Sequence, residues 1–199
     1  MKKILMFILS FFTVSCKDEL EDLFDRHQWI TYTINKGDHY SGEHVAPFHG
    51  EKIKFITIFD NSAIYETVNV SNQTDINKLY GFTDCGSSDV FDVGLIHENS
   101  TRFGWAWNLA TKKVDIYAYT YVNKVCIHNY MTSVELNTEY TYEIDASGSE
   151  YIFNVNGITT NMKRGCSNHG GIKFLAFPYF GGSETAPHKI TVQIKELKQ

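Results

Sequence analysis

Three acidic side chains between positions 89 and 98 are the local candidates for acid–base chemistry on a glycosidic bond. They are Asp89, Asp92 and Glu98, in the stretch D-V-F-D-V-G-L-I-H-E. Enzymes that hydrolyse such bonds place two carboxyl groups roughly 5 to 9.5 Å apart. If the stretch is a strand, Asp92 and Glu98 share a face but lie about 20 Å apart, while Asp89 and Asp92 point to opposite faces. This spacing argues against a local catalytic pair, although carboxylates from distant strands could still meet.

Histidines and loop carboxylates are the residues that could hold a metal ion. His39, His44 and His49 recur every five residues, a spacing that fits neither one face of a strand nor the ligands of a zinc site. Calcium needs only loop oxygens and stays open, but no D-x-D-x-D run is present. The sequence therefore predicts no defined metal site and no cofactor. The loop carboxylates considered for calcium are Asp84, Asp89 and Glu184.

Aromatic residues, which are 15% of the chain, recur at alternate positions in two strand-like runs. Alternate side chains of a strand lie on one face, so each run forms a trio of rings on a single face. We expect one trio to fill the core and the other to line an open face. There the rings could stack on a sugar while polar neighbours bond its hydroxyls. The expected core trio is Phe103, Trp105 and Trp107; the expected binding residues are Tyr117, Tyr119, Tyr121, Arg102, Asn108 and Glu98.

Three cysteines beyond position 16 could form one disulfide in an oxidising compartment. All three pairings are open, and so is the fully reduced state. Cys85 and Cys166 lie in polar, loop-like contexts in which disulfide geometry is easier to satisfy. Cys126 lies in the strand-like V-C-I and is expected to be a small buried hydrophobic residue. We therefore favour a bond between Cys85 and Cys166.

The elements that must position these residues follow a secretory signal peptide. Lys2 and Lys3 precede an almost unbroken apolar run over residues 4–12, which is too short to cross a bilayer as a stable helix. The next residues, T-V-S-C, resemble the lipobox of bacterial lipoproteins, in which the cysteine is acylated and becomes the first residue. The resemblance implies a lasting lipid anchor at Cys16, because two or more acyl chains hold a protein stably on a membrane.

The residues after Cys16 indicate where the anchored protein would lie. Lys17, Asp18 and Glu19 resemble the lysine-then-two-acids export signal of Bacteroidetes surface lipoproteins. The resemblance implies attachment to the outer membrane with exposure on the cell surface; a periplasm-facing lipoprotein is the alternative. We expect a signal peptide over 1–15, a lipidated cysteine and tether over 16–28, and a folded domain over 29–199.

Composition supports one domain without a nucleic-acid partner. The formal net charge is −5 and no cluster of lysine or arginine is present, which argues against nucleic acid or acidic lipid as a ligand. Only three prolines occur, and no repeat or low-complexity segment divides the chain. The residues that follow the signal are enough for one hydrophobic core.

The pattern within that domain predicts an all-β antiparallel sandwich. Short runs of β-branched and aromatic residues alternate with Gly, Asn, Asp and Ser. Asn156-Gly157 predicts a hairpin turn, because both positions tolerate positive φ. The predicted strands are 29–34, 52–59, 63–70, 90–97, 102–107, 113–122, 140–145, 151–155, 172–177 and 189–196.

The order of these elements resembles the concanavalin-like or laminin-G-like jelly roll over about residues 50–197. Residues 103–119 look like its central hairpin and 140–157 like the next one. The E-x-D-x-x-E strand of laminarinase-type jelly rolls is absent. The Q-I-H plus Y-F-K-A-G signature of the alginate-lyase type is also absent, and Cys126-Ile127-His128 only echoes it. The resemblance therefore implies a fold rather than an activity.

Three further stretches resemble a pattern of uncharacterised Bacteroidetes proteins, which carries no activity over to this chain. Each can also be explained as a polar loop with turn glycines or as an aromatic strand end. The stretches are residues 72–82, 98–107 and 178–188.

These observations lead to three hypotheses. The first is a surface-anchored, non-catalytic lipoprotein that binds glycan through the aromatic face. The second is a structural lipoprotein that binds another protein. The third, which the sequence favours least, is a polysaccharide hydrolase or lyase whose catalytic groups come from separate strands.

Overall fold

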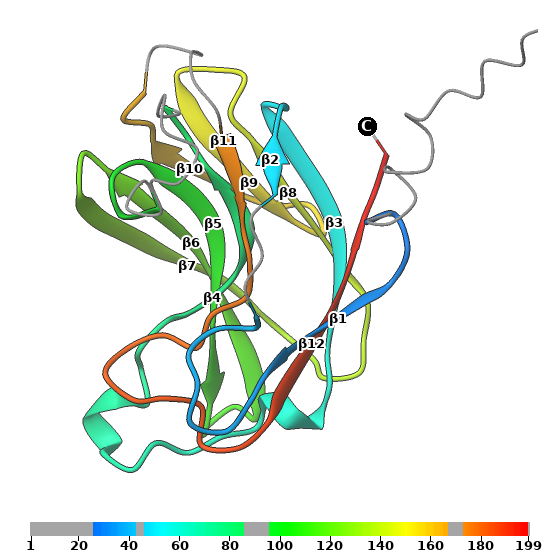
Figure 1. Ribbon diagram of the computed structural model, residues 1–199, viewed down its shortest axis with the longest axis vertical. Helices are drawn as coiled ribbons and strands as arrows, with labels where there is room; N and C mark the ends of the chain where they lie inside the picture. The colour runs from blue at the N-terminus through cyan, green and yellow to red at the C-terminus, as the bar shows by residue number, and fades with distance from the viewer. Residues whose placement is uncertain (1–25, 43–45, 86–95, 167–172, 199) are drawn as a thin grey trace, which may run out of the picture.

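The computed structural model describes residues 26–42, 46–85, 96–166 and 173–198, and within them the strands form two antiparallel sheets packed face to face (Figure 1). The first sheet has the order β1-β12-β3-β8-β9-β10, and the second has the order β2-β11-β4-β5-β6-β7. The predicted all-β sandwich is confirmed. The strands are β1 (Ile30–Ile34), β2 (Pro47–Phe48), β3 (Lys52–Phe59), β4 (Asn77–Thr83), β5 (Ser100–Asn108), β6 (Lys113–Val122), β7 (Val125–Val134), β8 (Tyr140–Asp145), β9 (Glu150–Val155), β10 (Ile158–Lys163), β11 (Lys173–Ala176) and β12 (Ile190–Glu196).

Aromatic rings from both sheets fill the space between them. Phe103 on β5 packs edge-on against Phe153 of β9, with ring centroids 5.0 Å apart. Trp105, also on β5, contacts Phe59 of β3 at 5.2 Å. Phe103 and Trp105 are fully buried and Trp107 is 3% exposed, so the trio assigned to the core does lie in the core. Burial of such large apolar surfaces is the main stabilising term of a sandwich of this size.

Strands β5 and β6 are buried on both faces, unlike most strands of a sandwich. β3 alternates between buried and partly exposed residues, as a strand with one open face does. Every residue of β5 from Ser100 to Trp107 is buried. On the outer face of the second sheet, other parts of the chain must therefore cover Arg102 and its neighbours.

Most predicted strands are confirmed, with bounds that coincide for β3, β6 and β8. The Asn156-Gly157 turn is also confirmed: both residues have positive φ, and Val155 pairs with Ile158. The stretch predicted as a strand over 90–97 falls almost entirely outside the described residues, and its last two residues lie in a short turn.

The strand predicted over 63–70 is wrong. This stretch runs between two single-turn 3-10 helices, Asn61–Ala63 and Val70–Asn72, each capped by the side chain that precedes it. Ala63 and Tyr65 reach the core, but Val68 is 95% exposed. Alternation alone does not make a strand without a neighbouring strand to pair with. In the described part of the chain, no helix is long and apolar enough to cross a bilayer.

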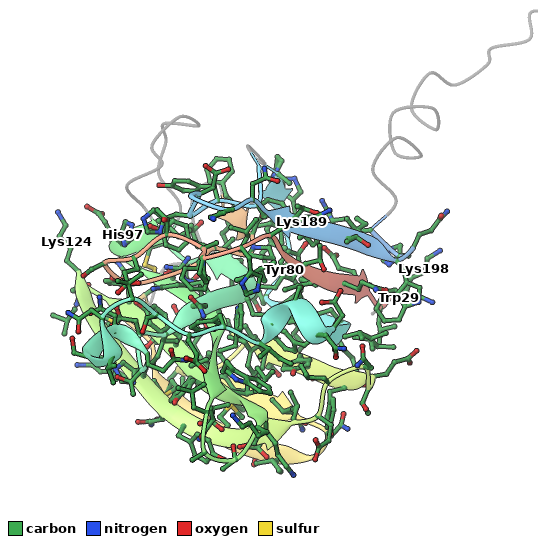
Figure 2. The ribbon with its side chains drawn as sticks, turned by 90° about the horizontal axis from the view of Figure 1, so that it is seen from below. Trp29, Tyr80, His97, Lys124, Lys189 and Lys198 are labelled. Carbon is green, nitrogen blue, oxygen red and sulfur yellow. A yellow bond between two sulfur atoms is a disulfide. The ribbon has the colours of Figure 1, made fainter. Side chains whose placement is uncertain are left out.

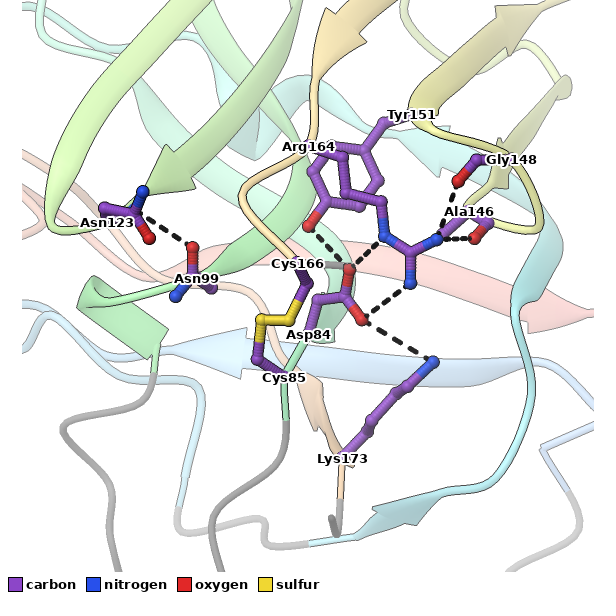
Figure 3. Close-up of a disulfide and its surroundings, with 10 residues drawn as sticks. All are labelled: Asp84, Cys85, Asn99, Asn123, Ala146, Gly148, Tyr151, Arg164, Cys166 and Lys173. Atoms are coloured by element: carbon purple, nitrogen blue, oxygen red, sulfur yellow. Dashed lines mark hydrogen bonds and ion pairs between the residues drawn. A yellow bond between two sulfur atoms is a disulfide. The ribbon is translucent and has the colours of Figure 1, made fainter. Parts of the chain in front are cut away.

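A buried ion-pair network joins the two sheets at one end of the sandwich (Figure 3). Asp84, at the end of β4, accepts hydrogen bonds from Arg164 Nε at 2.6 Å and Nη2 at 3.1 Å. Tyr151 of β9 donates its hydroxyl to Asp84 at 2.9 Å, and Lys173 Nζ lies 3.6 Å from the same carboxylate. The pKa of Asp84 is held low by these partners although burial opposes the shift. The network satisfies a carboxylate that would otherwise be costly to bury.

The structure joins Cys85 to Cys166 beside this network (Figure 3). Their Cα atoms lie 5.5 Å apart, although the residues are 81 positions apart in sequence. The bond ties the end of β4, in the second sheet, to the segment that follows β10, in the first sheet. The disulfide therefore closes a long loop of chain between Cys85 and Cys166, and the ion pair between Asp84 and Arg164 joins nearly the same two points.

We predict that Trp105→Ala destabilises the protein by about 3–5 kcal/mol, because a large ring between the sheets leaves a cavity when it is removed. Tyr130→Ala, at a ring that is 56% exposed on β7, is the matched comparison and should change stability by less than about 1 kcal/mol. Urea denaturation of both variants measures the difference. Equal losses would show that the outer face is packed as tightly as the core.

Candidate functional site

The outer face of the second sheet carries an open groove that is lined by residues between 74 and 78, by Gly182 and by side chains of β6 and β7. Of the stretches that the sequence pattern singled out, 72–82 and 178–188 contribute to this lining, and 98–107 pairs with the first of them. β4 pairs with β5, and Lys78 of β4 pairs with Tyr179 of the stretch 178–188. Asn77 accepts a hydrogen bond from the Gly181 amide at 2.8 Å. The structure thus brings all three stretches into contact.

Side chains on this face form three rows across four strands. One row runs from Lys78 through Gly104 and Tyr117 to Tyr130. The next runs from Gly81 through Arg102 and Tyr119 to His128, and the third joins Thr83, Ser100, Tyr121 and Cys126. The rows place tyrosines, two cations, a histidine and a thiol on one surface. Between them lies an open cavity of about 230 Å³, lined by Thr74, Asp75, Ile76, Lys78, Tyr119, Cys126, His128 and Gly182.

Arg102 lies beneath this surface and has no counterion among the described residues. It is only 3% exposed, and its Nε has no hydrogen-bond acceptor. Its guanidinium carbon lies 5.4 Å from the centre of the Tyr119 ring, so the ring face is the main partner of the charge. Burial lowers the pKa of Arg102 from its usual value. An arginine still carries its charge after such a shift, because its ordinary pKa is so high.

Glycine at position 81 lets the backbone of β4 approach β5 closely at Arg102. The pairing of the two strands is irregular between Lys78 and Gly81. A Cβ atom at Gly81 would lie 2.1 Å from the carbonyl oxygen of Thr101 and 2.5 Å from Cα of Arg102. Only glycine fits there, so the strand that carries Lys78 runs directly beside Arg102.

Lys78 is the second cation of the groove, and it lines the cavity directly. Its ammonium group donates to the Ile76 carbonyl at 2.8 Å and lies 5.0 Å from the centre of the same Tyr119 ring. It also lies 5.7 Å from the ring of Tyr179. Burial, and then the like charge of Arg102, lower the pKa of Lys78 to about 8. Lys78 is therefore still mostly protonated at neutral pH.

Aromatic rings form the floor on the β6 and β7 side. His128 stacks parallel to Tyr119, with centroids 6.3 Å apart, and Tyr130 meets Tyr117 edge-on at 5.8 Å. Tyr130 is 56% exposed, whereas Tyr119 is only 5% exposed. The expectation that all three β6 tyrosines form an open platform thus needs correction. Tyr119 is covered by its neighbours, and the open rings lie around it.

The opposite wall is built from the segment after β11. Tyr179 stacks on His39 at 5.2 Å and meets the edge of Tyr40 at 4.9 Å. His39 Nδ1 also lies at hydrogen-bond distance, 2.8 Å, from the Phe180 carbonyl oxygen, so His39 helps to hold this segment in place. Gly182 has φ +86, and a Cβ atom there would clash with the Asp75 carboxylate at 2.0 Å. Glycine at this position keeps Asp75 and the loop in contact.

Two of the predicted binding residues are engaged in other contacts. Glu98 forms an ion pair with Lys124 at 2.9 Å. Asn108 caps the turn between β5 and β6, where its Oδ1 accepts from two backbone amides. Its amide also donates to Asp115 at 2.8 Å. Asn108 lies on the groove side of β5, but its side chain stabilises the hairpin.

The described residues that were considered for metal binding do not converge. Asp84 is held by Arg164 and Lys173, and Glu184 accepts the backbone amides of Val68 and Asn69 at 2.8 Å each. Within the described residues, no group of three His, Cys, Asp or Glu side chains is arranged to hold a metal ion. Asp89, Asp92, His44 and the segment with Cys16, Lys17, Asp18 and Glu19 lie outside the described residues.

Cys126 does not behave as expected from its V-C-I context. It is exposed rather than buried, because β7 is an edge strand with one face open to solvent. Its thiol interacts with the Tyr119 hydroxyl. Sequence reasoning also missed Lys78, His128 and Tyr179 as groove residues. Some signals were present in the sequence. Lys78 and Tyr179 lie in the stretches 72–82 and 178–188, which were singled out by resemblance, and His128 is the last residue of Cys126-Ile127-His128.

Arg102 and Lys78 also act on His97, a histidine on the same face of the sheet. The ring of His97 meets Tyr121 edge-on at 5.2 Å. Burial, and then the charges of Arg102 and Lys78, lower the pKa of His97. Two cations without an ion-pair partner among the described residues thus lie on this face of a protein whose net charge is −5.

Comparisons with known proteins agree with this architecture. No protein-family model and no curated protein sequence matches the chain. Among solved structures, the alginate lyase AlyC3 is similar with a TM-score of 0.56 at 12% identity, over 87% of this chain and 76% of that one. AlyC3 in complex with dimannuronate gives 0.54 at 11% identity, over the same shares. A carbohydrate-binding module, CBM66 from Bacillus subtilis, gives 0.36 at 8% identity, over 84% and 91% of the two chains.

At these identities the likeness shows the fold alone. The chain is a concanavalin-like jelly-roll sandwich, the architecture that the order of its strands predicted. A shared fold does not by itself define an activity.

The two buried arginines allow a matched stability test. We predict that Arg102→Met leaves the protein at least as stable as the wild type, because it removes a buried charge that has no counterion. Arg164→Met should cost about 3–5 kcal/mol, because it leaves Asp84 buried without its main partner. Urea denaturation of both variants decides the point. A loss for Arg102→Met as large as that for Arg164→Met would mean that Arg102 has a counterion within the protein.

Proposed function

We propose that the protein is a non-catalytic glycan-binding lipoprotein that holds its ligand in the groove on the outer face of the second sheet. The observation that carries this proposal is the set of tyrosine rings on that open face, outside the hydrophobic core. Rings of this kind stack on sugars through their apolar faces and keep a polar tip in water. Asp75, Lys78 and His128 line the cavity together with Tyr119 and supply hydrogen-bonding groups next to this face.

The lipid anchor proposed at Cys16, with the export signal at Lys17, Asp18 and Glu19, would hold this groove at the cell surface. The tether joins the domain near Trp29, and Arg26 is fastened to Glu196 of β12 by an ion pair of 2.8 Å. Figure 2 shows Trp29 and Lys198 at one side of the molecule, with His97 and Lys124 at the other. His97, whose ring contacts Tyr121 on the outer face, therefore lies on the side of the molecule away from Trp29. This arrangement favours capture of a glycan from the medium.

Cleavage of the bound glycan is a second candidate, favoured by one observation. His128 is an exposed imidazole that stacks on Tyr119, the ring that Arg102 also contacts. Among the described residues that line the cavity, however, Asp75 is the one carboxylate, whereas hydrolysis by two carboxyl groups needs a pair. A reducing-end assay on any glycan that binds separates the two candidates. Release of new ends by the wild type, lost in His128→Ala, would replace binding by catalysis.

We predict that Tyr130→Ala weakens glycan binding about tenfold without a matching loss of stability, because it removes an exposed stacking surface. Ile152→Ala, at an exposed residue of β9 on the first sheet, is the control and should bind as the wild type does. A glycan array identifies the ligand, and isothermal titration calorimetry measures both variants. Equal affinities of the Tyr130→Ala variant and the wild type would place the ligand elsewhere.

The anchor has its own test. Cys16→Ser should abolish incorporation of labelled palmitate and release the protein from the membrane fraction, because that sulfur would carry the acyl chain. Replacing Lys17, Asp18 and Glu19 by alanine should keep the lipid but protect the protein from external protease. Membrane retention of the Cys16→Ser variant would exclude lipidation at this cysteine.

A further inference from the structure

We propose that the groove selects acidic glycans, and that Lys78 binds their carboxylate or sulfate group above the fixed positive charge of Arg102. The proposal rests on glycan binding in the same groove and adds the chemical class of the ligand. It starts from two cations on one face, both within 5.4 Å of the centre of the Tyr119 ring, that have no ion-pair partner among the described residues.

Arg164 shows how this protein treats a buried cation that serves the fold. It is paired with both carboxylate oxygens of Asp84 and also donates to the carbonyls of Ala146 and Gly148. Arg102 is buried to a similar extent but has no such partners. A buried charge without a counterion lowers stability, so a protein retains one at a cost to its fold. An anion that arrives with the ligand would offset that cost.

The groups around Lys78 do not neutralise it. Its ammonium group has three protons, and one is donated to the Ile76 carbonyl. Asp75 lines the same cavity, but its carboxylate accepts the Ser183 amide and forms no ion pair with Lys78. Burial raises the pKa of Tyr119 well above its usual value, so that ring stays neutral and contributes only its face. Two donor positions of Lys78 are therefore open to an anion.

The two cations have different roles. Lys78 lines the cavity and can contact a ligand, whereas Arg102 lies under Tyr119 and does not line it. Arg102 acts through Lys78 and through its long-range field, which is strong because little water surrounds it. Burial, and then the same two charges, lower the pKa of His97, whose ring meets Tyr121 edge-on on this face. A neutral sugar would gain nothing from this field, but a uronate or a sulfated sugar would.

The main experiment compares acidic and neutral glycans on the full-length protein purified in detergent. The probes are hexasaccharides of glucuronate, galacturonate and mannuronate, their methyl esters, a sulfated hexasaccharide and neutral hexasaccharides. Each methyl ester keeps the sugar and linkage and removes only the charge. We expect at least one acidic probe to bind about tenfold or more tightly than its neutral counterpart, the size of one charge-assisted hydrogen bond.

The possible results separate the two levels of the proposal. Preference for a uronate over its ester identifies a carboxylate, and preference for the sulfated probe alone identifies a sulfate ester. Equal binding of charged and neutral probes, or binding of neutral probes alone, overturns the acidic selectivity and leaves glycan binding intact. No binding of any probe overturns both.

Variants then test the two residues. Lys78→Met should remove the preference for the acidic probe, Lys78→Arg should keep most of it, and Lys36→Met, at an exposed lysine in the loop after β1, should change nothing. Thermal denaturation of each variant checks that it is folded. An unchanged preference in a folded Lys78→Met variant would contradict the proposed role.

The pH dependence of binding distinguishes the role of Arg102 from a structural one. Lys78 on β4 shares this face with Arg102 of β5, Tyr119 of β6, Cys126 and His128 of β7, Tyr179, and Asp75 before β4. The Cys126→Ser background removes the thiol from the titration. Because Lys78 loses its proton near pH 8, affinity for the acidic probe should fall about tenfold from pH 7 to pH 9. Arg102→Met should weaken binding and move this fall to higher pH, because it removes a like charge. A fall at the same pH in Arg102→Met would overturn the positioning role.

Discussion

The burial of Arg102 without a counterion among the described residues is the constraint to which the outer face of the second sheet is adapted. Glycine at position 81 lets β4 approach β5 beside the guanidinium, and Tyr119 covers it with a ring face. Lys78 and Tyr179 close the surface above. Each of these contacts makes the charge tolerable, and none of them cancels it. The result is a face with two cations in a protein whose net charge is −5, and that contrast underlies the proposed selectivity for acidic glycans.

Other interactions in the sandwich offset the cost of burying this charge. Rings from both sheets fill the interior, and the network of Asp84, Arg164 and Lys173, with the disulfide beside it, ties the sheets together at one end. This rigid support matters because β5 carries core residues on one face and groove residues on the other. Phe103 and Trp105 fix the strand from inside, so Arg102 and Gly104 are presented outward in a constant register. Core residues and the residues beside the groove therefore alternate along one strand.

Much of the fold could be predicted from the sequence, because alternation and turn residues are local signals. β3, β6 and β8 were predicted with the observed bounds, and alternation correctly separated the Phe103, Trp105 and Trp107 face from the tyrosine face. β4 and β7 were missed, since β4 is irregular and β7 is an edge strand with little apolar alternation. The groove could not be predicted, because it depends on which distant segments become neighbours. Lys78 pairs with Tyr179, which is about 100 positions away in the sequence, and no local sequence pattern predicts that contact.

A structure of the protein with a bound acidic hexasaccharide tests the central claim most directly. The account predicts that sugar rings lie over the open tyrosines of β6 and β7, with the acidic group within hydrogen-bond distance of Lys78 Nζ. Arg102 should remain beneath Tyr119, close to the new negative charge. A ligand bound on the first sheet, or one in the groove with its acidic group turned away from Lys78, would contradict the account.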